Sequence, residues 1–181
     1  MSKIDGQDGR IAPEQYGSRN HALTFTDRTR KNLKFINEAR RNNQDVHPVT
    51  QTVNSMLGLL IFPHEKGFDA SIKKMPLAQL SSEGWPRIDV TLGESATLGE
   101  LVRRMRNAAA HRRITFSSDS SDALQEVVIT FSDKRRGDEG MTWCAQVNAT
   151  DLQVFALKFI GLLEKYEREG TVGRSRNDTA G

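Results

Sequence analysis

The stretch from Ser95 to Ile114, SATLGELVRRMRNAAAHRRI, predicts an amphipathic helix that ends in a cluster of cations around one imidazole. Thr97 and Glu100 have the T-x-x-E spacing of a capping box, which places the start of the helix near Thr97. Apolar residues recur at three- and four-residue steps and form one stripe: Leu98, Leu101, Val102, Met105, Ala108 and Ala109. Five arginines lie off or at the edge of that stripe, around His111: Arg103, Arg104, Arg106, Arg112 and Arg113.

Three other segments have helical patterns. A first helix is expected from Thr26 or Asp27 to about Arg41, anchored by Leu33, Phe35 and Ile36. A second begins at Pro48 and ends at Pro63, and its apolar content makes it the expected centre of the core. The last is expected from Thr150 or Asp151 to about Arg168, with core positions at Leu152, Phe155, Phe159, Leu162, Leu163 and Tyr166.

The rest of the chain predicts irregular and extended structure. Residues 65–94 contain scattered apolar positions and two prolines, so we expect an irregular connection with a short helix at 76–81. Residues 114–116, 126–132 and 141–147 favour strands. The predicted fold is therefore mainly α: a four-helix bundle, with a small antiparallel β-hairpin or meander inserted between the third and fourth main helices. We expect one domain at 23–168, between flexible tails at 1–22 and 169–181.

Composition suits a single globular domain of a reducing compartment. The chain has 181 residues, a net charge of +3 and an isoelectric point near 9.2, so the local arginine cluster is more informative than the total charge. A single cysteine, Cys144, excludes an intrachain disulfide. No apolar run approaches the roughly 20 residues of a membrane span, and the N-terminus lacks a signal-peptide core. A cytoplasmic protein without membrane association is expected.

Common cofactor and catalytic motifs do not occur. There is no Walker loop, no G-x-G-x-x-G and no C-x-x-C pair, and the four histidines have no metal-ligand spacing. No local motif supplies a base for a serine or cysteine nucleophile. We therefore expect neither a cofactor nor a metal.

What remains is the run from Arg106 to His111, RNAAAH, whose residue types suit phosphodiester chemistry on RNA. The 2′-hydroxyl of RNA is an internal nucleophile beside its own phosphate. A histidine can move protons near neutral pH. The planar guanidinium of an arginine matches phosphate oxygens and stabilises charge that builds on them.

The spacing of this run limits how its residues can act together. Five residues along a helix rotate by about 140°, so Arg106 and His111 do not share a face, whereas Asn107 and His111 do. Asn107 could therefore orient the imidazole by a hydrogen bond. Arg106 can reach His111 if its side chain wraps round, if the helix distorts near the alanines, or if a second chain completes the site. The third option predicts a symmetric dimer.

The RNAAAH run at the end of a helix resembles the R-x4-6-H motif of the HEPN superfamily, including the polar residue after the arginine. The order of segments is similar to a plasmid- and bacterium-borne HEPN branch, in which a helix like TVNSMLGLLIFPHE precedes the motif and one like DLQVFALKFIGLL follows a strand pair. The resemblance covers about residues 26–168. It implies a dimeric, metal-independent endoribonuclease of toxin–antitoxin or antiviral systems, with an antitoxin protein as a further partner. Arg106 and His111 would be catalytic and Asn107 supporting, and the product would carry a 2′,3′-cyclic phosphate.

Two other readings of the same residues stay open. In one, the chain resembles HEPN proteins that only bind nucleotide, RNA or a partner protein, and it has the same scaffold without catalytic activity. The role of four arginines is open in the same way: they would contact RNA phosphates or form a plain solvated charged surface, namely Arg103, Arg104, Arg112 and Arg113. Duplex DNA binding through the arginine-rich helix is a third reading, although no helix-turn-helix pairing accompanies it.

Overall fold

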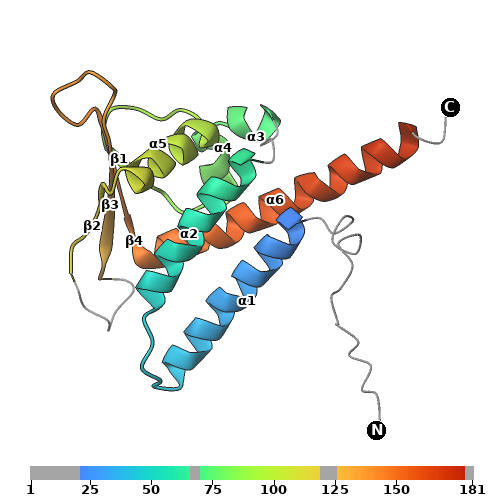
Figure 1. The fold of residues 1–181 in the computed structure, drawn as a ribbon, viewed down its shortest axis with the longest axis horizontal. Helices are drawn as coiled ribbons and strands as arrows, with labels where there is room; N and C mark the ends of the chain where they lie inside the picture. The colour runs from blue at the N-terminus through green and yellow to red at the C-terminus, as the bar shows by residue number, and fades with distance from the viewer. Residues whose placement is uncertain (1–20, 66–69, 119–125, 178–181) are drawn as a thin grey trace, which may run out of the picture.

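The computed structural model describes residues 21–65, 70–118 and 126–177. Within them it contains six helices and a four-stranded antiparallel sheet (Figure 1). The helices are α1 (His21–Arg41), α2 (Pro48–Glu65), α3 (Ala70–Lys74), α4 (Leu77–Ser82), α5 (Leu98–Ala110) and α6 (Ala149–Asn177). The strands are β1 (Asp89–Leu92), β2 (Ile114–Phe116), β3 (Val128–Asp133) and β4 (Trp143–Asn148).

Helix α5 begins as its sequence predicts. Thr97 is the N-cap residue: its side chain accepts a hydrogen bond from the N–H of Glu100, at 3.3 Å. The Glu100 carboxylate reaches back to the N–H groups of Thr97 and Ala96, which completes the capping box. The helix is continuous to Ala110, so a distortion near the alanines, one of the three ways considered for joining Arg106 and His111, does not occur.

The sheet is larger than the predicted hairpin or meander, and it is part of the core. Its strand order is β1-β4-β3-β2, so the strands before and after α5 form opposite edges. The pairing of β2, β3 and β4 confirms a three-stranded meander. Strand β1 was not expected, and it corrects the predicted sheet. It pairs with β4 through an irregular register between Val90 and Leu92, and its exposed residues give no alternating pattern.

The core joins the sheet to the helices rather than leaving the sheet beside a bundle. Helices α1, α2 and α6 contact one another, α5 contacts both α2 and β3, and α6 contacts β4 (Figure 1). Sheet and helices contribute to a single buried cluster that includes Phe131, Trp143, Met56, Leu101 and Phe159. The expected four-helix bundle is therefore a mixed arrangement in which α5 lies between α2 and the sheet.

The core stripe expected on the last helix is buried in its first half, whereas Leu162, Leu163 and Tyr166 are partly buried against the core. Leu152, Phe155 and Phe159 are buried, and the rings of Phe155 and Phe159 are stacked with centroids 6.1 Å apart. Trp85 packs edge-on against Phe155 at 5.3 Å. These aromatic side chains fill the interior.

Helix boundaries differ from the sequence expectations at several ends. Helix α1 begins at His21, before Thr26, and α6 extends to Asn177, beyond Arg168 and into the segment expected as a tail. Helix α2 continues past Pro63 to Glu65, which corrects the expected end at Pro63. Asn148 caps α6 instead of Thr150 or Asp151, since its Oδ1 accepts from the N–H of Asp151 at 2.7 Å.

One expected core anchor lies on the surface. Phe35 has 66% of its surface exposed, whereas Leu33 has 1%. Two residues along a helix differ by about 200°, so both cannot face the same core. None of the described helices is long and apolar enough to cross a membrane.

Gly99 provides a test of how closely α3 approaches α5. A Cβ at position 99 would lie 2.6 Å from the carbonyl oxygen of Lys73 and 2.8 Å from its Cα. Gly99→Ala should therefore lower the free energy of unfolding by about 2 kcal/mol, although alanine favours helices. Thermal unfolding measures the change.

Gly161→Ala is the matched control in α6, because a Cβ there meets nothing within 4 Å. It should raise the free energy of unfolding by about 1 kcal/mol. Equal stabilisation by both substitutions would contradict the close contact of α3 with α5.

Candidate functional site at the end of helix α5

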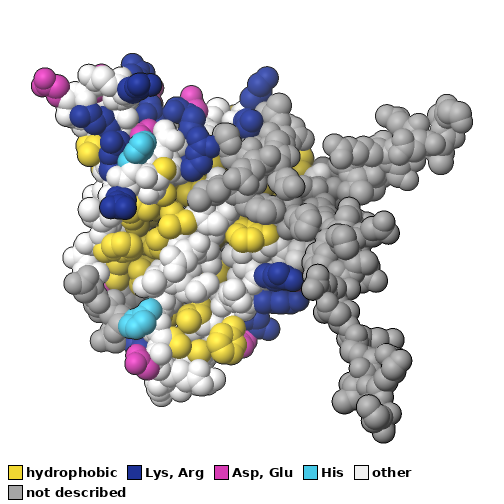
Figure 2. Space-filling view, in the orientation of Figure 1, with side chains coloured by type: hydrophobic (Ala, Val, Ile, Leu, Met, Phe, Trp, Pro, Cys, Tyr) yellow, Lys and Arg dark blue, Asp and Glu magenta, His cyan; other side chains and the backbone are white. Residues whose placement is uncertain are grey.

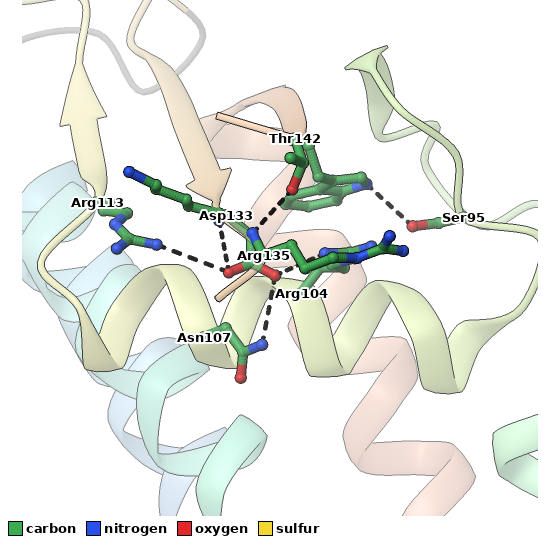
Figure 3. Close-up of polar contacts among 9 residues, drawn as sticks. Ser95, Arg104, Asn107, Arg113, Asp133, Arg135 and Thr142 are labelled. Atoms are coloured by element: carbon green, nitrogen blue, oxygen red, sulfur yellow. Dashed lines mark hydrogen bonds and ion pairs between the residues drawn. The ribbon is translucent and has the colours of Figure 1, made fainter. Parts of the chain in front are cut away.

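A buried carboxylate, Asp133 at the end of β3, joins the sheet to α5 (Figure 3). It is 2% exposed. Its Oδ2 accepts hydrogen bonds from Nη1 of Arg104 at 2.9 Å and from Nδ2 of Asn107 at 3.3 Å. Its Oδ1 accepts from the N–H of Lys134 at 2.9 Å. Asp133 thus holds two residues of α5 that lie one turn apart.

These contacts determine the ionisation of Asp133. Burial disfavours the charged carboxylate, but the hydrogen bonds from Arg104, Asn107 and the N–H of Lys134, together with the charge of Arg104, outweigh it. The pKa of Asp133 is therefore lowered from its ordinary value of 3.8. The residue is a buried anion at neutral pH.

Arg113, just beyond α5, also faces Asp133. Its Nη1 lies 3.8 Å from Oδ1 of Asp133, an ion pair without a hydrogen bond, and that nitrogen is buried with no hydrogen-bond partner. The backbone carbonyl of Arg113 accepts from the N–H of Ser132 at 3.0 Å. Asp133 and its strand therefore hold the chain on both sides of the turn that contains His111.

The turn after α5 has a left-handed residue at its centre. His111 is the C-cap, and Arg112 follows with a φ of 56°. The N–H of Arg112 donates to Ala109 and that of Arg113 to Ala108, which is the hydrogen-bond pattern of a Schellman motif. Glycine usually occupies this position, because a side chain there is strained. The sequence instead has a cation.

His111 is exposed, and its expected hydrogen bond with Asn107 does not form. The amide nitrogen of Asn107 donates to Asp133 instead. Asn107 therefore contacts the group that fixes the turn and does not orient the imidazole directly. This corrects the supporting contact expected from the shared helix face.

Arg106 lies on a different side of α5 from the Asp133 contacts. It is half-buried and lines a groove formed by α2, α3 and α5, together with Arg103. His111 is not among the described residues that line this groove. Because α5 is continuous through Ala110, two of the three expected ways to join Arg106 and His111 remain: a wrapped side chain or a second chain.

The seven expected site residues therefore divide into groups. Arg104, Asn107 and Arg113 surround Asp133, and Arg103 and Arg106 line the groove. His111 and Arg112 are exposed at the turn. Arg104 is an ion-pair partner of Asp133 with 17% of its side chain exposed, so it is not the plain solvated cation that one of the two readings expected.

Sequence reasoning missed Asp133, although a signal was present. Ile129 and Phe131 alternate inward along β3, and Asp133 continues that buried face with a charge. A carboxylate at an inward position requires a cationic partner. The arginine-rich helix supplies one.

The turn between β3 and β4 adds cations to the same region. Lys134, Arg135 and Arg136 follow Asp133, and Arg135 and Arg136 are exposed. Figure 2 shows Lys and Arg side chains gathered over α5 and this turn, with a histidine among them. In the described part of the chain, no group of three or more His, Cys, Asp or Glu residues could hold a metal ion.

Comparison with known proteins defines the class. The chain belongs to the HEPN superfamily, so the resemblance found in the sequence is confirmed. Within that superfamily the chain belongs to the family described as HEPN pEK499 p136, whose model matches residues 1–170. This membership indicates a nuclease or RNA-related function. Searches of curated proteins and of solved structures found no match.

Replacing Asp133 tests the contact between β3 and α5. Asp133→Asn leaves Arg104 without its ion-pair partner and should lower the free energy of unfolding by about 3 kcal/mol at pH 7. The lowered pKa means that the ionised form stabilises the fold above pH 3.8 and that this contribution is lost as pH falls further. The difference in the free energy of unfolding between wild type and Asp133→Asn should therefore become smaller in acid, as measured by denaturant unfolding at several pH values.

Asp138→Asn is the control, since Asp138 is exposed in the same turn. It should change stability by less than about 0.5 kcal/mol. A pH-independent difference between wild type and Asp133→Asn would contradict the buried-anion assignment.

Arg112→Gly tests the strain at the end of α5. Glycine adopts a positive φ without cost, so this substitution should raise the free energy of unfolding by about 1 kcal/mol. Arg112→Ala removes the same charge but keeps the strain, and should not stabilise the protein. Equal stabilities of the two variants in thermal unfolding would argue against a strained backbone here.

Proposed function

We propose that this protein is a metal-independent endoribonuclease that cleaves RNA by attack of a 2′-hydroxyl on the adjacent phosphate. The observation that carries the proposal is the exposed His111 on a turn fixed by Asp133, within a surface rich in arginine. HEPN membership supports RNA as the substrate.

The chemistry follows from the residue types. A base removes the proton of the 2′-hydroxyl, the 2′-oxygen bonds to phosphorus, and the bond from phosphorus to the 5′-oxygen breaks. The leaving 5′-oxygen takes a proton, so the products are a 2′,3′-cyclic phosphate and a 5′-hydroxyl. His111 would transfer these protons, from the 2′-hydroxyl and to the leaving 5′-oxygen. The guanidinium of Arg106 would stabilise the charge on the phosphate oxygens. No step requires a metal or another cofactor.

A homodimer would bring Arg106 and His111 together across two chains. In one chain Arg106 lies on α5 and His111 is its C-cap, five residues further on, which corresponds to about 140° around an ideal helix, and α5 is continuous between them to Ala110. A two-fold axis near the end of α5 would place Arg106 of one protomer beside His111 of the other. We therefore propose two composite sites per dimer.

The remaining cations would guide RNA to this site. Arg103 and Arg112 are exposed, and Arg135 and Arg136 extend the same surface onto the β3–β4 turn. Arg104 and Arg113 would act indirectly, by holding Asp133. The resemblance to toxin and defence proteins supports a role in such a system, with a possible antitoxin protein as partner, in the cytoplasm.

The second candidate is a binding module for nucleotide, RNA or protein on the same scaffold. The absence of an Asn107–His111 hydrogen bond favours it, because the imidazole lacks the orienting contact expected of a proton-transfer group. This alternative predicts binding of RNA without cleavage.

Cleavage of single-stranded RNA in the presence of chelator separates the two candidates. The wild-type protein should cut RNA without added metal, and His111→Ala or Arg106→Ala should reduce the rate by at least about 100-fold. Both variants should keep their fold and bind RNA, as measured by circular dichroism and filter binding. Wild-type protein that binds RNA but never cuts it would favour the binding module.

Mixing the two inactive variants tests the composite site. In an equimolar mixture about half of the dimers are mixed, and each has one site with both residues intact, so about a quarter of wild-type activity should return. No recovery is expected if Arg106 and His111 act within one chain. The mass in solution should be that of a dimer, and a strict monomer would exclude the composite site.

A further inference from the structure

A groove of about 310 Å³ opens between α2, α3 and α5 on the Arg106 side of the site. Leu60 of α2 and Val102 of α5 provide aliphatic side chains on its walls. Three of its lining residues are cations: Lys73, Arg103 and Arg106. Its volume is at the lower end of the range for small-molecule sites, which is about 300–1,000 Å³.

The groove exists because α3 packs directly on α5. Gly99 has no side chain, and the backbone of Lys73 occupies the space that a Cβ would fill. The contact sets α3 beside the stripe formed by Gly99, Val102, Arg103 and Arg106, which recur at three- and four-residue steps of α5. The groove is therefore a defined feature of the packing.

The charges that line the groove favour an anionic ligand. Glu100 is the single carboxylate among its described lining residues, and that carboxylate accepts hydrogen bonds from the N–H groups of Ala96 and Thr97. The groove is therefore lined by three cations and by one carboxylate that already accepts hydrogen bonds from the backbone. A ligand with an apolar body and a phosphate matches both the aliphatic walls and the arginine side chains.

We infer that this groove binds a nucleotide of the RNA, with its base against Leu60 and Val102 and its phosphate at Arg103 and Arg106. The inference rests on the proposed function in one respect: the phosphate at Arg106 would be the one that is cleaved or its neighbour. The groove then determines which base is accepted beside the cut. His111 has no part in holding that base.

Mononucleotides test the groove apart from cleavage, because they contain no internucleotide bond to cut. The full chain is titrated by calorimetry with adenosine 3′-monophosphate and uridine 3′-monophosphate, and with adenosine and inorganic phosphate as the separate parts. At least one nucleotide should bind more tightly than either part. Arg103→Ala and Val102→Trp should each weaken it by about tenfold, by loss of a charged contact and by filling the groove.

Arg41→Ala is the matched control. Arg41 is exposed at the end of α1, which lies far from α3 (Figure 1), and its replacement should leave nucleotide affinity unchanged. If Val102→Trp does not fold, Arg103→Ala still tests the site, because Arg103 is an exposed side chain. The base preference of RNA cleavage should also change in Val102→Trp.

The possible results separate this inference from the proposed nuclease activity. Nucleotide binding that depends on Arg103 but without any RNA cleavage would support the groove and count against the nuclease. Cleavage of RNA with nucleotide affinity no better than that of inorganic phosphate would overturn the groove and leave the nuclease intact. An acidic peptide such as hexaglutamate that binds through Arg103 where nucleotides do not would also overturn the inference.

Discussion

The buried carboxylate of Asp133 is the interaction on which the rest of the site depends. A charge with 2% exposure is tolerated in a protein interior when cations and hydrogen-bond donors compensate for lost hydration. Arg104, Asn107 and the backbone of Lys134 do this, and Arg113 adds a second cation. Four segments, namely α5, the turn after it, β3 and the β3–β4 turn, therefore have positions fixed relative to one another.

Local signals made α5 and the main helices predictable from the sequence. The Thr97–Glu100 capping box involves residues three apart, so its pattern is readable without knowledge of the fold. Strand β1 was not predictable in this way. Its partner, β4, lies more than fifty residues further along the chain, and its pattern is short, exposed and interrupted by an irregular register. Long-range pairing supplied the structure that local propensity did not indicate.

The same distinction explains what was and was not predicted at the site. Arg106 and His111 could be singled out because their residue types and spacing are local. The contacts that Arg104, Asn107 and Arg113 make with Asp133 could not be predicted from the sequence, because their partner is distant: Asp133 lies 29 residues after Arg104. A lone acidic residue at an inward position of β3 was the available clue, and it needed the sheet to be interpreted.

Helix α5 has thirteen residues, and different sides of it meet different parts of the protein. One stripe belongs to the interior, one faces Asp133, and one borders the groove with α3. Sequence change in this helix is consequently coupled to change elsewhere in the chain. A lineage that lost Asp133 would have to alter Arg104 and Asn107 together, whereas Val102 and Arg103 could vary with whatever occupies the groove. The geometry of one short helix thus separates positions free to diversify from positions that must evolve as a set.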